Sequence, residues 1–262
     1  MESVDGSPPA WVVSTLRASG CVFAEDEARL LETEATSPEH LAAMVDRRAA
    51  GEPLEQLLGW AEFCGLRIVV EPHVFVPRRR TELLVHEAAG RVRPGAVVVD
   101  MCCGTGAVGV ALATAVPGVE LHAVDIDPAA VRCARRNVAA RGQVYEGDLF
   151  EPLPTTLRAR IDVILANAPY VPTAAVGLMP PEARLHEHRV ALDGGVDGLD
   201  VQRRVAAAAP DWLAPGGHLL IETSDRQSSQ TVAAMRGYGL APVVARSEDL
   251  DATVVIGSMP GR

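Results

Sequence analysis

The fold class of this chain is decided by one stretch, Val97-Val98-Val99-Asp100-Met101-Cys102-Cys103-Gly104-Thr105-Gly106-Ala107-Val108-Gly109. An apolar run leads into a glycine-rich turn, and the turn leads into a pattern that predicts a helix over residues 107–115. Glycine lets the backbone approach a ligand closely, and the N-terminus of a helix offers free N–H groups to an anion. The stretch is therefore typical of a ligand-binding turn between a buried strand and a helix.

The same alternation continues toward the C-terminus. Apolar runs predict strands at residues 96–102, 121–126, 161–166 and 218–221, with weaker candidates at 243–244 and 253–256. Helical patterns separate them at residues 128–140, 199–213 and 227–235. Apolar strands that alternate with helices indicate an α/β fold, a doubly wound parallel sheet covered on both faces. The connection between the last two strand candidates is too short for a parallel crossover, so we expect an antiparallel hairpin there.

The N-terminal part of the chain reads as short helices. Apolar and acidic amphipathic patterns predict helices at residues 11–16 and 24–34, and Ser37-Pro38-Glu39 is a helix start whose helix should end near Arg48. Two short apolar segments predict a hairpin within residues 60–70. We therefore expect two domains, a helical domain over residues 1–75 that includes this linker hairpin and a sheet domain over residues 76–262.

Composition excludes several classes of protein. The chain of 262 residues has 34 Asp and Glu against 24 Lys and Arg, a net charge of −10, which disfavours a bulk nucleic-acid binder. It contains no lysine, which excludes Schiff-base chemistry and a P-loop lysine. Its five cysteines are an odd number without a CxxC pair, so we expect a reducing compartment and neither disulfides nor a zinc site. With no basic leader pattern and no long apolar run, we expect a cytoplasmic protein without a membrane span.

The glycine turn is compatible with two classes of ligand. Gly104, Gly106 and Gly109 match the dinucleotide fingerprint, and Asp125, at the end of the next strand, can bind ribose hydroxyls. Asp100, just before the turn, instead suits S-adenosylmethionine, whose amino group and sulfonium both favour a nearby carboxylate. The glycine pattern does not choose between these ligands, and a plain tight turn with a helix packed behind it is the structural alternative.

The segment after the strand at residues 161–166 is more specific. That strand delivers Asn167 to its C-terminal end, and Pro169 biases Ala168 toward an extended conformation. The Asn167 side-chain oxygen and the Ala168 carbonyl can then point into the same space, where two acceptors suit the planar NH2 group of an amide or of a nucleobase. Tyr170 can pack its ring against such a group. The structural alternative is a proline turn in which Asn167 caps its own backbone.

Further segments accompany these motifs in order along the chain. They are Gly51-Glu52-Pro53-Leu54, Glu62-Phe63, Val76-Pro77-Arg78 with Thr81-Glu82, Gly147-Asp148-Leu149-Phe150, and residues 191–199 and 213–217. With them, nearly the whole chain resembles the PrmC/HemK protein-glutamine N5-methyltransferases, which methylate the glutamine of a Gly-Gly-Gln sequence in peptide release factors. The resemblance implies a class I, Rossmann-like fold with a seven-stranded, mainly parallel sheet and an antiparallel last strand.

The resemblance also implies the cofactor and the roles of residues. The cofactor would be S-adenosyl-L-methionine, without a metal, and the reaction would be N-methylation of a glutamine side-chain amide by positioning and preorganisation. The cofactor-binding residues would be Asp100, Cys102, Cys103, Gly104, Thr105, Gly106, Asp125, Ile126, Asp148, Leu149 and Asn167. The acceptor would be held by Asn167, Ala168, Pro169 and Tyr170. Residues 1–75 would recognise the substrate, and residues 76–262 would form the catalytic domain.

Three positions depart from the family pattern. Ala168 replaces the first proline of Asn-Pro-Pro-Tyr, Arg79-Arg80 replaces Pro-Glu in the linker, and Cys102 replaces the first glycine of the cofactor loop. We expect the acceptor to be a glutamine side-chain amide of a protein, such as a release factor, with a small-molecule amine or amide as the alternative. Adenine is a further alternative that the acidic charge disfavours. An NAD-dependent oxidoreductase would leave residues 167–170 without a role, and a binding module without activity is the last alternative.

Other polar residues favour ordinary structural interpretations. The spacing of Asp193, Asp197 and Asp200 misses the calcium-loop pattern and predicts a glycine-rich turn before a helix. His186 and His188 lack the spacing of a zinc helix and are expected to be solvated loop residues. The cysteines at 102 and 103 are expected to be buried at a strand end. Residues 78–80 are either a solvated charge cluster or contacts for an acidic partner.

Overall fold

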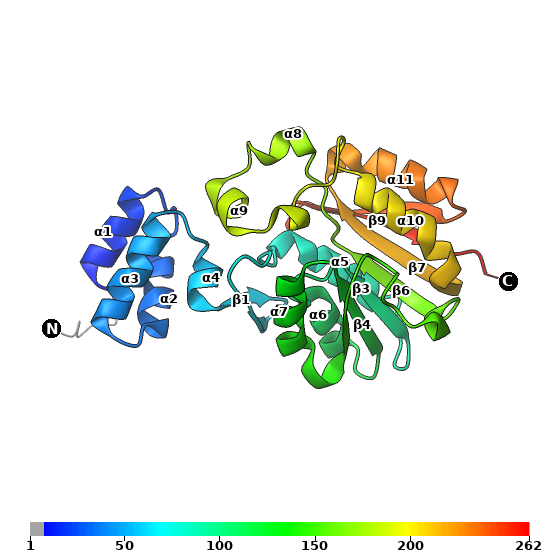
Figure 1. Ribbon diagram of the computed structural model, residues 1–262, viewed down its shortest axis with the longest axis horizontal. Coiled ribbons are helices and arrows are strands. Elements are labelled where there is room, and N and C mark those ends of the chain that lie inside the picture. The colour runs from blue at the N-terminus through cyan, green and yellow to red at the C-terminus, as the bar shows by residue number, and fades with distance from the viewer. Residues whose placement is uncertain (1–7, 262) are drawn as a thin grey trace.

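The computed structural model describes residues 8–261. Figure 1 shows an elongated molecule in which a small group of helices, at the N-terminal end, adjoins a larger sheet domain. Among the described residues, no helix has both the length and the apolar character needed to cross a membrane.

Four helices form the N-terminal group. They are α1 (Ala10–Ala18), α2 (Ala24–Glu34), α3 (Pro38–Ala49) and α4 (Leu54–Leu58). The Ser37 hydroxyl accepts the His40 N–H at 3.1 Å and caps α3, as the Ser-Pro-Glu signal predicts. Apolar side chains of α1 to α3, among them Leu16, Leu31 and Met44, form a separate small core. The three predicted helices are confirmed, and α4 is an additional one.

A hairpin and a short helix connect this group to the sheet. Strands β1 (Trp60–Phe63) and β2 (Leu66–Val69) pair antiparallel, so the predicted hairpin is confirmed. After it come the 3-10 helix η1 (Arg79–Thr81) and α5 (Glu82–Ala89). Phe63 and Ile68 of the hairpin pack into the core of the sheet domain. The division at residue 75 stays a prediction.

The sheet has seven strands in the order β5-β4-β3-β6-β7-β9-β8. They are β3 (Val97–Met101), β4 (Glu120–Asp125), β5 (Gly142–Glu146), β6 (Ile161–Ala166), β7 (Leu213–Thr223), β8 (Ala241–Ser247) and β9 (Ala252–Ser258). Each strand pairs parallel with its neighbour from β5 across β4, β3 and β6 to β7. Strand β9 pairs antiparallel with both β7 and β8. The expected mainly parallel sheet with an antiparallel last strand and a terminal hairpin is confirmed. Strand β5 is absent from the strands expected from apolar runs.

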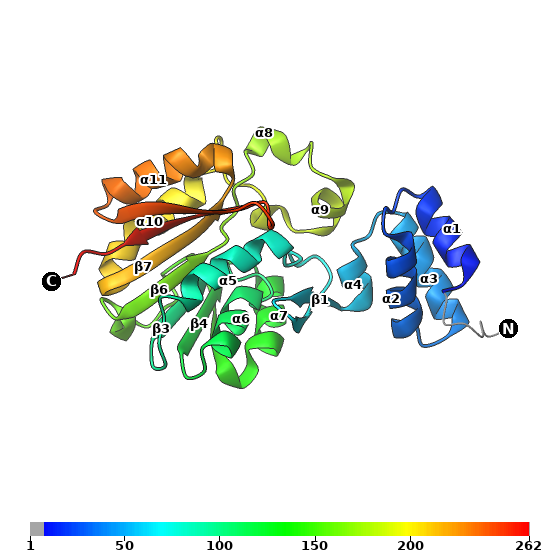
Figure 2. The same ribbon diagram turned by 180° about the vertical axis from the view of Figure 1, so that it is seen from behind.

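Helices cover both faces of the sheet (Figure 1, Figure 2). Helices α5, α6 (Ala107–Ala115) and α7 (Pro128–Val138) pack with Val98 of β3 on one face. Helices α10 (Asp200–Trp212) and α11 (Ser228–Gly237) pack with Val99 of β3 on the other. Consecutive residues of β3 thus point to opposite, buried faces, as a doubly wound sheet requires.

Strand order reverses at β3, whose neighbours are β4 and β6. Such a switch point opens a crevice at the carboxyl ends of the strands. The segment between β6 and α10 contains α8 (Thr173–Val176), α9 (Pro181–His186) and the 3-10 helix η4 (Arg189–Ala191). This insertion lies over the crevice and contacts the N-terminal helices through an Arg48–Glu182 ion pair of 2.6 Å.

Candidate active site

A cavity of about 430 Å³ lies at the carboxyl ends of β3, β4 and β6. This volume is within the range of small-molecule sites. Every residue expected at the site lines the cavity except Gly106. Those that line it are Asp100, Cys102, Cys103, Gly104, Thr105, Asp125, Ile126, Asp148, Leu149, Asn167, Ala168, Pro169 and Tyr170. The structure therefore brings the two sequence motifs together in one place.

Asp100 is a buried carboxylate at the end of β3, with 2% of its surface exposed. Its Oδ2 accepts the Gly109 N–H of α6 at 2.8 Å. A Cβ at Gly109 would come within 3.1 Å of that oxygen and 2.8 Å of Leu121, so only glycine allows this approach. Burial raises the pKa of Asp100 to about 7, and the charge of Asp125 adds to the rise, while the hydrogen bond from Gly109 opposes it.

The cofactor turn after β3 is strongly bent. Cys102 has φ of +57°, a left-handed conformation that favours glycine, although glycine is replaced here. At Gly106, with φ of +76°, a Cβ would lie 3.2 Å from Val138. Burial, and then the Asp125 and Asp100 carboxylates, raise the pKa of the Cys102 thiol. Cys102 is partly exposed to the cavity, whereas Cys103 is buried, and burial raises the pKa of its thiol as well.

Asp125 connects the end of β4 to this turn. Its Oδ2 accepts the Gly104 N–H at 2.8 Å, and its Oδ1 accepts the Asp127 N–H at 2.9 Å. Each carboxylate oxygen retains further acceptor capacity, which suits the hydroxyls of a ribose. The neighbouring Ile126 exposes 51% of its surface and lines the cavity, where it offers an apolar face.

Asp148 lies on the wall of the cavity beside Leu149. Its carboxylate forms an ion pair of 2.6 Å with Arg204 of α10, a residue that also lines the cavity. A ligand that binds Asp148 through an amino group therefore shares that carboxylate with the guanidinium. The sequence motif did not indicate this partner, because Arg204 comes from a distant helix.

Asn167 follows β6, and its side chain has a defined orientation. The Nδ2 group donates to the Thr81 hydroxyl across 3.3 Å. This hydrogen bond engages the nitrogen side of the amide, whereas Oδ1 accepts no hydrogen bond from the part of the chain that the structure describes. The Asn167 side chain therefore bonds η1 and does not cap its own backbone, as the structural alternative supposed. Ala168 is 1% exposed, and both residues line the cavity.

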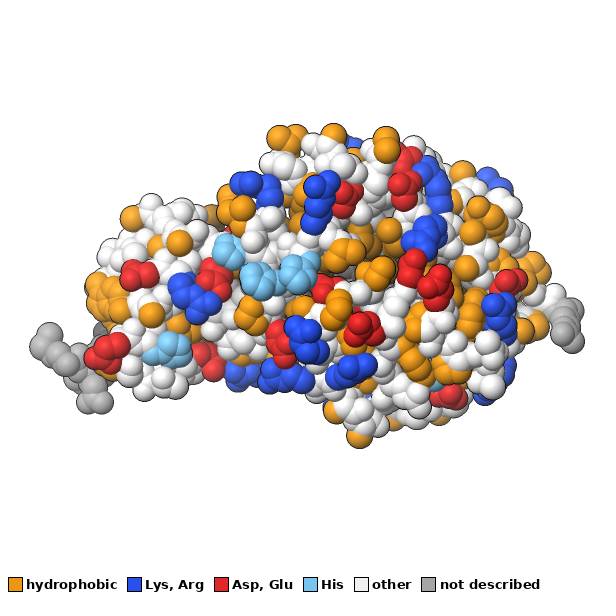
Figure 3. Space-filling model, in the orientation of Figure 1, with side chains coloured by type: hydrophobic (Ala, Val, Ile, Leu, Met, Phe, Trp, Pro, Cys, Tyr) orange, Lys and Arg blue, Asp and Glu red, His pale blue; other side chains and the backbone are white. Residues whose placement is uncertain are grey.

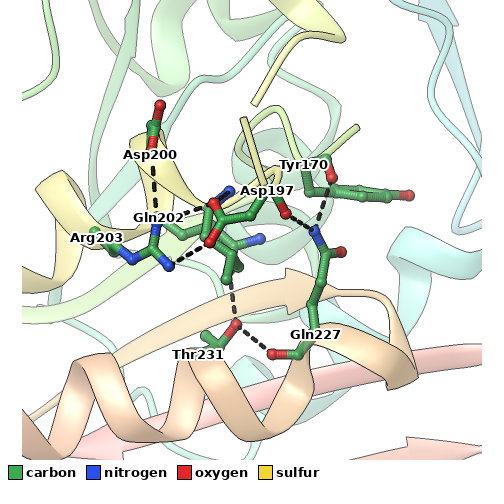
Figure 4. A network of polar contacts seen from close by, with 8 residues as sticks. Tyr170, Asp197, Asp200, Gln202, Arg203, Gln227 and Thr231 are labelled. Carbon is green, nitrogen blue, oxygen red and sulfur yellow. Dashed lines mark hydrogen bonds and ion pairs between the residues drawn. The ribbon is translucent and has the colours of Figure 1, made fainter. Parts of the chain in front are cut away.

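Tyr170 ends this segment and is held through its backbone. Its carbonyl accepts Gln227 Nε2 at 3.0 Å, and the same nitrogen donates to the Asp197 carbonyl at 3.0 Å (Figure 4). Asp197 itself forms an ion pair with Arg203, as Figure 4 also shows. The segment 167–170 is thus fixed at both ends by side chains from other elements.

Two further charged residues at the site were not assigned from the sequence pattern. Arg78 lines the cavity and forms an ion pair with Glu187, whose side chain is completely buried and also accepts the Val76 N–H at 3.1 Å. Arg78 therefore pairs with a buried acidic residue of its own chain, and contact of residues 78–80 with an acidic partner stays a prediction. A sequence separation of 109 residues gives no local signal for such a pair.

A stacked pair of histidines lies next to Asp127, a residue that lines the cavity. His73 and His188 stack with their ring centroids 5.6 Å apart, and His188 Nδ1 pairs with the Asp127 carboxylate. Figure 3 shows histidine side chains gathered in the middle of this face. His188 is exposed as expected, although it has a carboxylate partner. Apolar lining that sequence reasoning missed comes from Phe75, Pro77, Met179, Val190 and Val201.

These features fit S-adenosylmethionine. A buried carboxylate whose pKa is raised toward neutrality is stabilised by a cationic ligand, and Asp100 at the cavity wall meets that condition. A second carboxylate with free lone pairs lies one strand away, at Asp125, as a ribose requires. A doubly wound sheet with a glycine turn and this pair of carboxylates defines the class of Rossmann-like methyltransferases.

Comparisons with known proteins identify the family. Residues 66–189 match the methyltransferase small domain family. A release factor glutamine methyltransferase of Geobacter sulfurreducens is 45% identical over 205 residues, which are 76% of this chain and 71% of that protein. A 4-amino-L-phenylalanine/4-methylamino-L-phenylalanine methyltransferase of Streptomyces pristinaespiralis is 37% identical and covers 74% of this chain and 69% of its own. A methyltransferase structure from Pyrococcus furiosus, with a TM-score of 0.58 and 17% identity, covers 82% of this chain and 99% of its own and supports the fold.

The chain belongs to the release factor glutamine methyltransferase family. It is an enzyme, a transferase with S-adenosyl-L-methionine as cofactor. The resemblance stated from the motifs is confirmed, and the oxidoreductase alternative is set aside.

Proposed function

We propose that this enzyme methylates the side-chain amide nitrogen of a glutamine in a peptide release factor. The observation that carries the proposal is the orientation of Asn167, whose nitrogen is engaged by Thr81 so that its oxygen is free for an acceptor N–H. Ala168 lines the same cavity and supplies a backbone carbonyl beside it. Two acceptors match the two N–H bonds of a primary amide. Relatives named release factor glutamine methyltransferases support a release factor as the protein substrate.

The chain's own residues act by positioning. Bound S-adenosylmethionine supplies an electrophilic methyl group on a sulfonium. An amide nitrogen is a poor nucleophile, so the Asn167 oxygen and the Ala168 carbonyl hold its two N–H bonds and align the lone pair. They also stabilise the positive charge that develops on the nitrogen, which is electrostatic preorganisation rather than general-base catalysis. Tyr170 packs against the planar amide, and Pro169 keeps the turn rigid.

Separate residues bind the parts of the cofactor. Asp100 would bind its cationic amino-acid end, and Asp125 would accept the ribose hydroxyls. Ile126, Asp148 and Leu149 line the cavity, and the family resemblance assigns Asp148 and Leu149 to its adenine end. The turn of Cys102, Cys103, Gly104, Thr105 and Gly106 would surround the amino-acid end. These assignments rest on the family resemblance, and the hydrogen bonds and burial described above support those of Asp100 and Asp125.

The N-terminal region, over residues 1–75, is proposed to recognise the protein substrate. Its helices contact the insertion over the cavity at two points, the Arg48–Glu182 ion pair and the Gln56 side chain, which donates to the His186 carbonyl at 3.0 Å. The five cysteines are free thiols, which supports a cytoplasmic location.

A small-molecule amine is the second candidate acceptor. Ala168 replaces a family proline, Arg80 lines the cavity in place of a family glutamate, and one relative acts on 4-amino-L-phenylalanine. Arg80 would complement the carboxylate of a free amino acid.

One experiment with two alternative acceptors separates these candidates. The full chain is incubated with S-adenosylmethionine and either a release factor with an intact Gly-Gly-Gln sequence or 4-amino-L-phenylalanine, and products are analysed by mass spectrometry. We expect one methyl group on the glutamine side chain and none when that glutamine is replaced by glutamate. Methylation of the amino acid alone would overturn the proposal.

A further inference from the structure

Glu222 is a buried carboxylate of β7 that the mechanism above does not use. Only 2% of its surface is exposed, and its Oε2 has no hydrogen-bond partner among residues 8–261. A buried, incompletely satisfied carboxylate is costly to a fold. In the sheet, Ile221 of β7 lies opposite Ala166 of β6, so Glu222 follows at the level of Asn167, where the acceptor-binding segment begins.

Thr81 links Glu222 to Asn167. Thr81 is itself 2% exposed, it accepts the Asn167 Nδ2 donor at 3.3 Å, and hydrogen bonding from its hydroxyl lowers the pKa of Glu222. An ionised carboxylate can only accept, and an amide NH2 group can only donate. Because a lone pair of the Thr81 hydroxyl faces Asn167, its single proton is available to the Glu222 carboxylate.

We propose that Glu222 and Thr81 are positioning residues that fix the side-chain amide of Asn167 with its oxygen toward the acceptor nitrogen. The three residues come from β7, η1 and the end of β6, and only Asn167 and Thr81 line the cavity. The inference rests on the proposed function, since it explains how the acceptor-binding oxygen is selected. If the side-chain amide of Asn167 were flipped, its NH2 group would face the NH2 group of the acceptor. The hydrogen bonds to Thr81 and to the acceptor would then both be lost.

Protonation of Glu222 reverses this arrangement. Burial raises the pKa of Glu222 to about 6, and Thr81 and Arg80 oppose the rise. Tyr170, a further titratable group near this carboxylate, has its own pKa raised mainly by burial. A protonated Glu222 can donate to Thr81, whose proton is then free to turn toward Asn167 and disfavour the productive amide orientation. We therefore expect an acid limb in kcat near pH 6 at saturating cofactor.

The test compares Thr81→Val, which removes the hydroxyl at constant shape, with Thr81→Ser, which keeps it. Thr81→Val should lower kcat on the order of 10²-fold, the usual effect of one lost preorganised polar contact. Thr81→Ser should retain most of kcat, and S-adenosylhomocysteine affinity should change less than about twofold in either variant. Thr253→Val, at another buried threonine on β9, is the matched control and should keep wild-type kcat. Wild-type kcat in Thr81→Val, or equal losses in the valine and serine variants, would overturn the proposal.

Glu222→Gln gives an independent measurement, because glutamine can still accept from Thr81 but does not titrate. It should keep activity near pH 8 and lose the acid limb near pH 6. The Asn167 side-chain NH2 resonances in 1H–15N spectra should likewise shift with a midpoint near pH 6 in wild type and not in Glu222→Gln. This readout needs no acceptor, so it tests the positioning role even if no glutamine is methylated and the proposed function fails. A pH-independent wild-type resonance, or an unchanged acid limb in Glu222→Gln, would overturn it.

Discussion

The side-chain amide of Gln227 donates to the backbone carbonyl of Tyr170 at 3.0 Å. Because the same nitrogen also bonds Asp197, one side chain ties the acceptor-binding segment to the loop before α10 (Figure 4). A Cβ at Gly198 would lie 2.2 Å from the Tyr170 oxygen, so the two loops are in direct backbone contact. The position of residues 167–170 therefore depends on groups that never touch a ligand.

Gln227→Glu should weaken this connection. The variant keeps the size of the side chain but loses the donor, and it places a carboxylate against two carbonyl oxygens. We expect the free energy of unfolding to fall by about 1–3 kcal/mol, the cost of unsatisfied buried groups, with a lower kcat and little change in cofactor affinity. Denaturant unfolding and steady-state kinetics measure both, and Gln230→Glu, on the exposed face of α11, is the control. Equal stability of the two variants would contradict this role.

Asp100→Asn should separate stability from cofactor binding. The folded-state pKa of about 7 lies above the unfolded value of about 3.9, so the contribution of Asp100 to stability is present below about pH 4 and is lost as the pH rises through about 7. Above that pH, Asp100→Asn should unfold no more readily than wild type. Its cofactor affinity should fall by about 1.5–3 kcal/mol, the value of a hydrogen bond to a charged group.

Calorimetry in buffers of different ionisation enthalpy checks the same group. Wild type should release a proton on binding S-adenosylmethionine below about pH 7, since the cation stabilises ionised Asp100, and Asp100→Asn should not. Asp211→Asn, at an exposed carboxylate paired with Arg158, should leave affinity and proton release unchanged. Wild-type affinity in Asp100→Asn would show that this carboxylate does not bind the cofactor.

Removing Arg78 should lower the free energy of unfolding. Arg78→Met leaves the fully buried Glu187 carboxylate without its cation, and because Arg78 is 34% exposed we expect a loss of about 1–3 kcal/mol, below the usual range for a fully buried pair. Burial already raises the pKa of Glu187 and Arg78 opposes the rise, so the defect should grow as the pH increases. Thermal unfolding at several pH values measures this, with exposed Arg79→Met as control. A pH-independent loss would argue against an orphaned carboxylate.

The sheet could be predicted because its signals are local. Strands β3 and β6 are almost entirely buried, and their apolar runs stand out in the sequence. Strand β5 escaped detection because it is an edge strand without fully buried residues, and Gly142-Gln143 is not an apolar run. Asp100, Asp125 and Asn167 could be expected at one edge of the sheet for a related reason, since parallel strands deliver their last residues to one edge.

The supporting contacts could not be predicted in this way. Thr81 and Asn167 are separated by 86 residues, and Gln227 and Tyr170 by 57. No periodicity relates such positions, and threonine or glutamine at one of them is compatible with an ordinary surface role. Only the fold brings Thr81 to the acceptor-binding segment, where its hydroxyl selects the orientation of an amide.

The most direct test of the proposed mechanism is the kcat of Asn167→Ala on a release factor at saturating S-adenosylmethionine. Ala168→Pro is the matched control, because it changes the same turn but keeps the carbonyl at that position. We predict that Asn167→Ala loses about 10²–10³-fold in kcat, retains S-adenosylhomocysteine affinity within about twofold, and unfolds as wild type does, while Ala168→Pro keeps its activity. Near-wild-type turnover by Asn167→Ala would contradict the mechanism and show that the acceptor nitrogen is held elsewhere.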